Sequence, residues 1–434
     1  MSKIIAIDTL GECRYDSPFK AKRQHFFYDD NGLIRHVHSR DYTAGSSVDE
    51  IEYFERAGAR EKIYFKPEEV VVGVVTCGGL CPGLNDVIRA VTFCAHEGYG
   101  VKKVLGFQYG YEGLVAKFFH PPIELDTTNT DEIHEKGGTI LKSSRGPQDT
   151  QEIVHTLRHY KVNILITIGG DGTLRGARDI QDEVKAQGLD IAVIGIPKTI
   201  DNDIGTIERS FGFQTAVQSA WEVINCAHAE AKAYRHGVGL VKLMGRESGW
   251  IATSTAASNS NVNFCLIPEV PFDIEGPNGF FEHLRRRLEL KDHAVVVVAE
   301  GAGQNLIPHA DSKDKSGNTK LADIGTFLRD EMLRWFGEKK CELNVKYFDP
   351  SYSIRSTPAN AADSEYCLFL GYNAMHAAMA GKTGMVVGLH NHRLVHLPIP
   401  MIGHRKLVDS HGWVWQGVLQ TTRQPTHMVN APAE

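Results

Sequence analysis

The segment IGIPKTIDND, at residues 194–203, places one lysine and two carboxylates directly behind a run of aliphatic residues. These charged side chains belong to Lys198, Asp201 and Asp203. A charge at the mouth of a buried strand costs several kcal/mol unless a partner compensates it. Either a neighbouring segment of the chain or a charged ligand must therefore neutralise these side chains.

Two glycine-rich turns follow aliphatic runs elsewhere in the chain. The run VVVGVVT precedes CGGLCPG at residues 77–83, and the run ILITI precedes GGDGT at residues 169–173. Glycine lets the backbone approach an anion closely, and the helix that follows points its first N–H groups at that anion. One such turn is a weak signal, but two at strand-to-helix junctions indicate phosphate binding. Neither turn is a Walker A motif or a correctly placed GxGxxG.

Asp171 stands inside the second glycine-rich turn. A carboxylate beside phosphates usually holds Mg²⁺, whose charge bridges the two groups of oxygens. The alternative role for Asp171 is that of a helix N-cap, a position that aspartate also favours. The residue types therefore predict a magnesium site at Asp171, with the cap as the competing interpretation.

Short runs rich in valine and isoleucine alternate with stretches of helical periodicity from Val70 onwards. This alternation predicts an α/β fold whose parallel-rich sheets are covered by helices on both faces. The number of such runs indicates two α/β domains rather than one. Ligands of open α/β sheets bind beyond the carboxyl ends of the strands, where the charged segment and both glycine-rich turns stand.

Composition narrows the class of protein. The chain has 434 residues, enough for two domains, and its net charge of −6 argues against non-specific binding of nucleic acid. No apolar run reaches the ~18 residues of a membrane span and no signal peptide is visible, so we expect a cytoplasmic protein without membrane contact. We expect the eight scattered cysteines to be buried thiols rather than disulfides or metal ligands.

GGDGT at residues 169–173 is followed by PKTIDND at residues 197–203, and then by LMGRESG, VAEGAG and DPSYSIR. This set, in this order, resembles the phosphofructokinase family over residues 70 to about 405. The run VVTCGGLCPGLN resembles the group of plant-type and trypanosomatid-type ATP-dependent enzymes. The resemblance implies two doubly wound (Rossmann-like) domains and transfer of a phosphoryl group from ATP to the 1-hydroxyl of fructose 6-phosphate, which gives fructose 1,6-bisphosphate.

The resemblance also implies roles for individual residues. Asp201 is the general base, Asp203 acts through the metal shell or orients Asp201, and Thr199 touches the transferring phosphate. Arg145 lies against the donor phosphates, where a guanidinium fork can bond two oxygens at once. The residues that match the nucleotide and Mg²⁺ site are Gly79, Arg145, Gly146, Gly170, Asp171, Gly172 and Thr173.

A second set of residues matches the sugar-phosphate site. Arg246 reaches the bridging phosphates, Glu300 accepts hydrogen bonds from sugar hydroxyls, and Arg355 beside Tyr352 binds the 6-phosphate. Lys346 matches a cation that a neighbouring subunit supplies, so we expect a homo-oligomer, a dimer or a tetramer. The full set is Thr199, Ile200, Asp201, Met244, Gly245, Arg246, Glu300, Lys346, Tyr352 and Arg355.

Two positions disagree about the phosphoryl donor. Relatives that use pyrophosphate carry an aspartate where this chain has Gly172, and its side chain would occupy the space of the α-phosphate of ATP. Lys198, by contrast, matches the residue that those relatives use on pyrophosphate. We give Gly172 more weight, because a lysine can swing aside whereas steric exclusion and charge repulsion cannot be evaded. ATP is therefore the predicted donor, with pyrophosphate as the alternative.

Two other classes of protein compete with this interpretation. A lipid or NAD kinase also carries GGDGT, but it lacks the other motifs. A non-catalytic regulatory subunit that binds sugar phosphate predicts a lost base or metal ligand, yet Asp171, Asp201 and Arg246 are all present.

The expected domains follow the family pattern. Residues 1–66 form an N-terminal extension that either wraps the main body or a partner subunit or is a partly disordered arm. Residues 67–212 with 354–404 form the nucleotide-binding domain, and residues 213–353 form the sugar-phosphate domain. The C-terminal segment, 405–434, has no assigned role.

Overall fold

The computed structural model describes residues 2–22, 27–29, 32–35, 51–308 and 320–430. The stretch SRDYTAGSSVDE of the expected extension lies outside these residues. No helix in the described part of the chain combines the length and apolar composition that crossing a membrane requires. All eight cysteines carry free thiols, and five of them are buried.

The chain divides into two compact units. Unit 1 consists of Met1–Thr199, Ile204–Gly212 and Thr357–Arg405, and unit 2 of Ile200–Asp203, Phe213–Ser356 and Lys406–Glu434. The sequence predicted the division at residue 212 and a second one near residue 354. It did not predict that the extension joins unit 1, or that Ile200–Asp203 and the C-terminal segment join unit 2. Which ligand each unit binds stays a prediction.

Unit 1 is built on a seven-stranded sheet of order β18-β17-β11-β10-β7-β8-β9, parallel except for the two edge strands. Its strands are β7 (Val71–Thr76), β8 (Lys103–Phe107), β9 (Ile123–Leu125), β10 (Ile164–Gly169), β11 (Ala192–Pro197), β17 (Met385–His390) and β18 (Arg393–Pro398). All residues of β10 and β11 are buried, which explains why these strands are continuous apolar runs rather than alternating ones.

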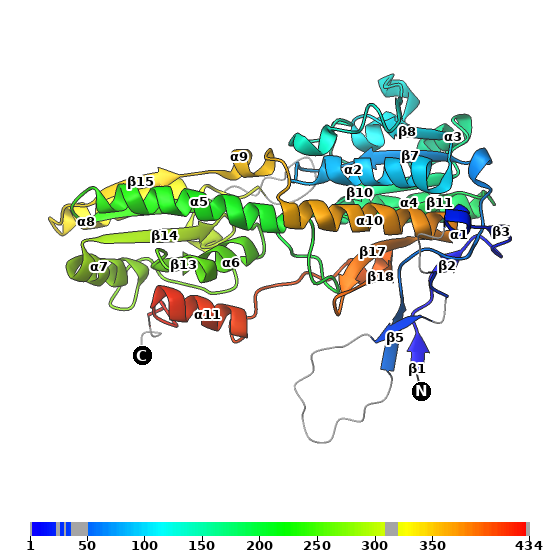
Figure 1. The fold of residues 1–434 in the computed structure, drawn as a ribbon. Coiled ribbons are helices and arrows are strands. Elements are labelled where there is room, and N and C mark those ends of the chain that lie inside the picture. The colour runs from blue at the N-terminus through cyan, green and yellow to red at the C-terminus, as the bar shows by residue number, and fades with distance from the viewer. Residues whose placement is uncertain (1, 23–26, 30–31, 36–50, 309–319, 431–434) are drawn as a thin grey trace. The chain divides into compact units, whose positions relative to one another are not determined.

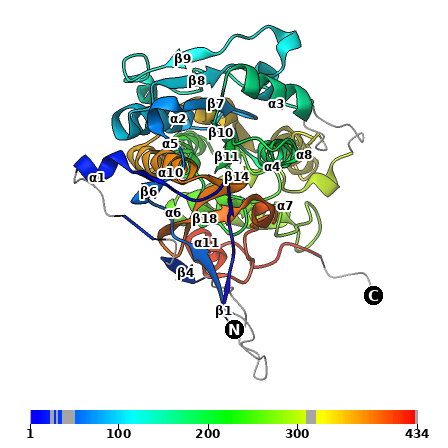
Figure 2. The same cartoon turned by 90° about the vertical axis from the view of Figure 1, so that its right-hand side faces the viewer.

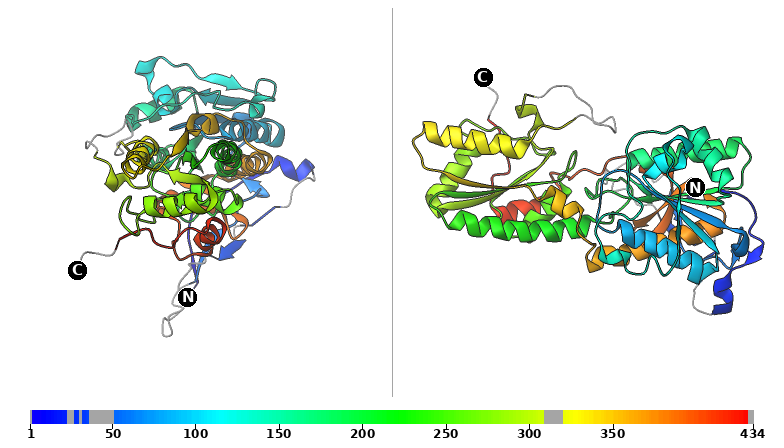
Figure 3. Two further views of the ribbon diagram at one scale, coloured as in Figure 1. Left: turned by 90° about the vertical axis from the view of Figure 1, so that its left-hand side faces the viewer. Right: turned by 90° about the horizontal axis from the view of Figure 1, so that it is seen from above.

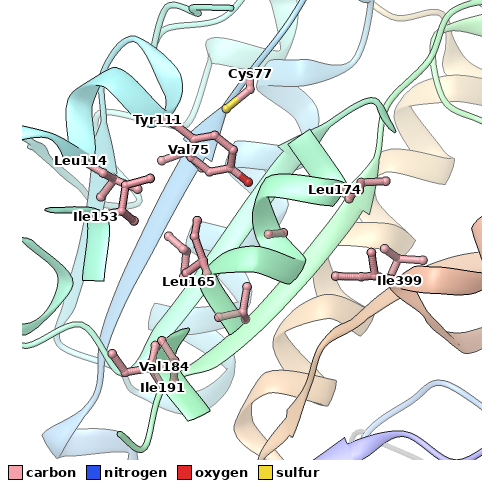
Figure 4. Close-up of a cluster of buried hydrophobic side chains, with 14 of the residues drawn as sticks. Val75, Cys77, Tyr111, Leu114, Ile153, Leu165, Leu174, Val184, Ile191 and Ile399 are labelled. Atoms are coloured by element: carbon pink, nitrogen blue, oxygen red, sulfur yellow. The ribbon is translucent and has the colours of Figure 1, made fainter. Parts of the chain in front are cut away.

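Helices cover both faces of this sheet (Figure 2). Helices α2 (Leu84–Phe93) and α10 (Ala361–Met379) lie on one face, and α3 (Thr150–His159) and α4 (Asp171–Ala186) on the other. On the second face Leu165 of β10 packs with Leu174 and Val184 of α4 in a hydrophobic core of the unit (Figure 4). The packing of this buried face of α4 against the sheet therefore fixes the position of the N-terminus of the helix.

The described part of the N-terminal extension packs against unit 1. Its elements are β1 (Ser2–Ile4), β2 (Asp8–Thr9), β3 (Tyr15–Asp16), α1 (Pro18–Lys22), β4 (Leu33–Arg35), β5 (Ile51–Glu55) and β6 (Lys62–Ile63). Strand β5 pairs with β1 and β4, and β2 pairs with β16 (Lys382–Thr383). The pairing of β2 with β16 attaches this described part of the extension to unit 1, and a contact with a partner subunit stays a prediction.

A buried ion cluster fastens β5 to unit 1. The Glu55 carboxylate lies 2.7 Å from Arg60 Nη2, 3.0 Å from Lys382 Nζ and 3.0 Å from His396 Nδ1. Burial alone would raise the pKa of Glu55, but the hydrogen bonds and charges of His396 and Lys382 lower it to about 2. Removing one partner of a buried ion pair strongly destabilises a protein. This cluster therefore anchors β5 of the extension to the rest of unit 1.

Unit 2 has a four-stranded, fully parallel sheet of order β13-β14-β12-β15. Its strands are β12 (Gly237–Leu243), β13 (Phe264–Leu266), β14 (His293–Ala299) and β15 (Asn344–Phe348). Its helices are α5 (Phe213–Lys232), α6 (Trp250–Ser258), α7 (Phe280–Lys291), α8 (Ile324–Glu338), α9 (Ser351–Arg355) and α11 (Trp413–Thr422). Helices α5 and α6 cover one face of the sheet, and α7 and α8 cover the other (Figures 1 and 3). The C-terminal α11 packs on α6. Both units therefore have the predicted α/β architecture.

Candidate active site

Three neighbouring strands of unit 1 deliver the predicted phosphate loops to one edge of the sheet. Strand β10 lies between β7 and β11, and all three run parallel. At their carboxyl ends the backbone N–H of Cys77 donates to the carbonyl of Ile168 at 2.9 Å, and that of Lys198 donates to Gly169 at 3.0 Å. Both glycine-rich turns and the PKT segment therefore begin side by side, as the sequence predicted.

Lys198 is fastened to the first glycine-rich turn. Its ammonium donates a hydrogen bond of 2.6 Å to the carbonyl of Gly79, and the residue is only 7% exposed. A lysine held in this way does not swing freely, so the reason given above for discounting Lys198 as a sign of pyrophosphate use is wrong. The Lys198 ammonium therefore lies beside the first glycine-rich turn, and its positive charge is available there to either phosphoryl donor.

Arg145 lies beside the same turn. A Cβ atom on Gly79 would stand 3.3 Å from the Arg145 guanidinium, so the glycine lets the arginine lie close to the backbone. Gly146 has a φ of +103°, a conformation that side chains rarely adopt, so the SSRG turn requires glycine at this position. The structure thus places Arg145 at the first glycine-rich turn, and its contact with the donor phosphates stays a prediction.

The second glycine-rich turn opens helix α4. A Cβ atom on Gly169 would lie 2.2 Å from the Thr173 hydroxyl, so no other residue fits there. Gly170 occupies the cap position and Asp171 is the first residue of the helix, which rules out the N-cap interpretation of Asp171. Gly172 is exposed, and a Cβ atom on it would have no neighbour closer than 3.9 Å. The turn therefore exposes the α4 N-terminus and leaves open space at Gly172.

A magnesium ion fits this arrangement as a ligand shared with phosphates. The described residues contain no group of three or more His, Cys, Asp or Glu side chains that could enclose a metal ion. Mg²⁺ is usually held by one or two carboxylates together with substrate phosphates and water, rather than by an all-protein cage. Asp171, in the second glycine-rich turn at the N-terminus of α4, is a carboxylate of that kind.

Two strands of unit 2 bring the sugar-phosphate residues together. Strands β12 and β14 pair in parallel up to Leu243 and Ala299, so Met244, Gly245 and Arg246 emerge next to Glu300. Across this edge the backbone N–H of Glu300 donates to the carbonyl of Leu243 at 2.8 Å. The sequence predicted these neighbours because both segments follow aliphatic runs.

Gly301 makes this close approach possible, and the sequence analysis missed it. A Cβ atom on Gly301 would lie 1.9 Å from the carbonyl oxygen of Arg246, which no side chain tolerates. Its N–H donates to the Gly245 carbonyl at 3.0 Å. Gly301 thus holds the Arg246 loop against the Glu300 loop. The signal for it was the VAEGAG motif, which drew attention only to its glutamate.

Asp201 stands in a group of like charges. Its Oδ1 is buried, and burial, followed by the charges of Asp203 and Glu300, raises the pKa of Asp201 to about 8. A hydrogen bond from the Arg246 backbone and the charge of Arg355 act in the opposite direction. Burial likewise raises the pKa of Glu300. A carboxyl group with a pKa near neutrality is well matched to general-base catalysis.

Arg355 and Lys346 each lie beside a tyrosine ring, but in different parts of unit 2. The Arg355 guanidinium lies 4.8 Å from the ring centroid of Tyr352, whose side chain projects into solvent. Lys346 pairs with Gly239 inside β15, and its ammonium lies 4.5 Å from the ring of Tyr234, which precedes β12. Within one chain Lys346 is therefore away from the carboxyl ends of the strands, and its action on a neighbouring subunit stays a prediction.

Lys406 positions the TIDND segment and was not predicted. Its ammonium donates to Asn202 Oδ1 at 3.0 Å, and its backbone N–H donates to the carbonyl of Asp203 at 2.7 Å. Trp250 Nε1 in turn donates to the Lys406 carbonyl at 2.7 Å. Asn202 has a φ of +53°, a conformation that needs such support. Because Lys406 is far from the TIDND segment in the sequence, no local motif could predict this contact.

We expect Lys406→Met to lower kcat about 3- to 10-fold, because one charge-assisted hydrogen bond to the loop is lost. Steady-state kinetics should show a KM for ATP that stays within twofold, and Lys406→Arg should recover most of the loss. Lys291→Met, which removes an exposed lysine of α7, serves as the control. An unchanged kcat and an unchanged pH profile for Lys406→Met would show that the loop holds its geometry without this side chain.

Comparisons with known proteins agree with this geometry. Residues 71–378 match the family model described as Phosphofructokinase. The chain is 46% identical to the ATP-dependent 6-phosphofructokinase of Borreliella burgdorferi over 98% of its own length and 97% of the relative. It is 47% identical to the ATP-dependent 6-phosphofructokinase of Trypanosoma cruzi over 85% of its own length and 76% of that relative.

A solved structure supports the fold. The pyrophosphate-dependent phosphofructokinase of Marinobacter aquaeolei aligns with a TM-score of 0.67 over 81% of this chain and 91% of that one, at 19% identity. At this low sequence identity, the alignment shows only that the fold is shared and does not identify the phosphoryl donor.

Proposed function

Because the chain belongs to the phosphofructokinase family, we propose that it transfers the γ-phosphate of ATP to the 1-hydroxyl of fructose 6-phosphate. The products are fructose 1,6-bisphosphate and ADP. The observation that carries this function is the environment of Asp201, a buried carboxyl group whose pKa is raised to about 8 at a sheet edge that also presents Arg246 and Glu300. A regulatory subunit without catalysis would not need such a base.

The unit 2 residues prepare the acceptor sugar. Asp201 accepts the proton of the 1-hydroxyl as the oxygen attacks the γ-phosphorus. Glu300 orients the sugar through its hydroxyl groups, and Arg355 binds the 6-phosphate. Arg246 supplies positive charge where negative charge accumulates on the transferring group. Asp203 orients Asp201 and raises its pKa through charge repulsion.

The unit 1 residues prepare the donor. The N–H groups at the start of α4 and of the first glycine-rich turn bind the phosphate oxygens, and Arg145 and Lys198 neutralise their charge. Asp171 would hold Mg²⁺, and the ion would neutralise negative charge on the donor phosphates. Thr199 contacts the transferring phosphate and is two residues from Asp201 in the chain. Chain connectivity thus links the donor-binding residues to the base.

A coupled assay for fructose 1,6-bisphosphate tests this function. The purified protein should form the product from fructose 6-phosphate, Mg²⁺ and ATP, and pyrophosphate should replace ATP poorly or not at all. Activity confined to pyrophosphate would overturn the donor assignment. Failure to form fructose 1,6-bisphosphate from either donor would overturn the function itself.

Gly172→Asp should weaken the use of ATP selectively. The new carboxylate enters open space beside the phosphates, where it excludes the α-phosphate sterically and repels its charge. We expect kcat/KM for MgATP to fall at least about tenfold, while KM for fructose 6-phosphate changes little. Gly172→Ala adds a methyl group without charge and should stay close to the parent. Unchanged ATP kinetics in Gly172→Asp would show that Gly172 does not select the donor.

The assembly and location belong to the same proposal. Lys346 acts in the active site of a neighbouring subunit, so the active protein is a dimer or a tetramer in the cytoplasm. Mixing Lys346→Ala with Asp201→Asn subunits should restore activity, because hybrid oligomers pair an intact base with an intact lysine. Mixtures that stay inactive would contradict the shared site.

A further inference from the structure

Lys242 is a largely buried lysine that no step of the proposed reaction uses. It lies in β12, two residues before Met244, and its side chain is 12% exposed. Strands β12 and β15 pair in parallel up to Val241 and Phe348. Lys242 therefore stands where β15 ends, beside the DPSYSIR segment that begins at Asp349.

The Lys242 ammonium bridges two carboxylates. Its Nζ lies 2.9 Å from Asp349 Oδ2 and 3.1 Å from Asp323 Oδ1. Burial alone would lower the pKa of Lys242, but the hydrogen bonds to Asp349 and Asp323 raise it, so the ammonium keeps its charge. Without that charge the two carboxylates would lie close together with no counter-ion between them, which is unfavourable in a partly buried site.

Asp349 connects Lys242 to helix α9. Its Oδ1 accepts a hydrogen bond of 2.6 Å from the hydroxyl of Ser351 and one of 3.2 Å from the backbone N–H of the same residue. Ser351 is the first residue of α9, which comes shortly after β15 (Figure 1). Arg355 is the last residue of α9, and its Nε donates to the Ser351 carbonyl at 3.3 Å. One oxygen of Asp349 therefore holds the start of the helix that carries Arg355, and the other oxygen contacts Lys242.

Asp323 anchors the other side of Lys242. It caps helix α8, because its Oδ1 accepts hydrogen bonds from the backbone N–H of Gly325 at 3.1 Å and of Thr326 at 3.2 Å. The hydroxyl of Tyr347 in β15 donates to the same oxygen at 3.3 Å. Helix α8 packs on β12 and β15. Lys242 is therefore held between the start of a helix that packs on the sheet and the start of α9.

We propose that Lys242 is a positioning residue for the acceptor sugar, which acts through Asp349 to set the position of Arg355. The inference rests on the proposed function, in which Arg355 binds the 6-phosphate. A guanidinium fork must meet phosphate oxygens at a defined distance and angle, so a small displacement of α9 weakens that contact. Because two carboxylates engage its ammonium, Lys242 acts on the sugar through them rather than by contact.

Steady-state kinetics of Lys242→Met tests this role, since methionine fills much of the same space without a charge. We expect KM for fructose 6-phosphate to rise about tenfold, while kcat and KM for MgATP stay within about twofold. Lys242→Arg keeps a charged donor between the carboxylates and should recover most of the affinity. Lys232→Met, which removes an exposed lysine at the end of α5, is the control and should behave like the parent.

Arg355→Ala separates this inference from the proposed function. It should raise KM for fructose 6-phosphate by more than Lys242→Met does, because it removes the fork itself. A parent enzyme that does not turn over fructose 6-phosphate would overturn the proposed function. An unchanged KM in Arg355→Ala would overturn the role of Arg355 and, with it, that of Lys242. A raised KM in Arg355→Ala together with an unchanged KM in Lys242→Met would overturn the role of Lys242 alone.

Ser351→Ala tests the same network if melting curves show that Lys242→Met does not fold. It removes only the hydroxyl that binds Asp349, on the α9 side of the network. KM for fructose 6-phosphate should then rise about threefold with kcat unchanged, as the loss of one hydrogen bond predicts. An unchanged KM in Ser351→Ala would in that case overturn the proposal. A folded Lys242→Met variant that lowers kcat and leaves KM unchanged would also overturn it.

Discussion

Asp201→Asn is expected to lower kcat about 10²- to 10⁴-fold, because the amide cannot accept the proton of the sugar hydroxyl. The substitution keeps the size of the side chain, so fructose 6-phosphate and ATP should still bind within a few-fold of the parent affinity. Steady-state kinetics and calorimetry measure the two quantities separately. Asp330→Asn, which makes the same change at an exposed carboxylate of α8, serves as the control. Near-normal turnover in Asp201→Asn would assign the base elsewhere.

The same variant should lose a pH dependence. The pKa of Asp201 is raised from 3.8 to about 8, and the base acts only when it is ionised. The kcat/KM of the parent for fructose 6-phosphate should therefore rise with pH and level off above about pH 8. The residual activity of Asp201→Asn should lack this limb of the profile.

As the pH rises, the ionisation of Asp201 should lower the stability of the folded protein while it raises the activity. Between about pH 4 and about pH 8 the folded protein keeps a proton on Asp201 that the unfolded chain releases, so this group lowers stability as the pH rises through that window. Asparagine has no charge to bury. The melting temperature of Asp201→Asn should therefore exceed that of the parent by a few degrees at pH 8 and by less at pH 5. An equal or lower value at pH 8 would contradict the raised pKa.

Asp171→Ala should reduce activity with MgATP about 10²- to 10³-fold, because the metal loses its protein carboxylate and the phosphate charges lose their counter-ion. The Mg²⁺ concentration that gives half-maximal activity should rise at least about tenfold. Activity measured over a Mg²⁺ titration gives both quantities.

Asp179→Ala is the matched control, since it removes an exposed carboxylate from the same helix, α4. It should behave like the parent. An Asp171→Ala variant with an unchanged Mg²⁺ requirement would show that the metal is held by other groups.

The sequence predicted most of the fold because the strands of both units are continuous apolar runs. Strand β10 is buried throughout, and its run ILITIG has the length and the β-branched residues of a strand inside a sheet. The glycine-rich turns were predictable for a related reason, since Gly169 and Gly170 stand where the chain turns sharply into α4. These signals are local, and local patterns are what a single sequence displays.

The parts that escaped prediction depend on residues far apart in the chain. Lys406 supports Asn202 from the other end of the sequence, and Glu55 joins β5 to Lys382. Lys198 looked mobile because lysine usually is, whereas the carbonyl of Gly79 fixes it. Contacts between residues so far apart in the sequence depend on how the chain packs, and no sequence motif indicates them.

The direct measurement of the central claim is ³¹P NMR of a single-turnover reaction that contains enzyme, Mg²⁺, ATP and fructose 6-phosphate. We expect the γ-phosphate to appear as a phosphate ester on carbon 1 of the sugar with the parent enzyme. With Asp201→Asn its appearance should be slower by two or more orders of magnitude. Transfer to carbon 1 at equal rates in both proteins would contradict the role of Asp201, and the absence of a sugar bisphosphate with the parent would contradict the reaction itself.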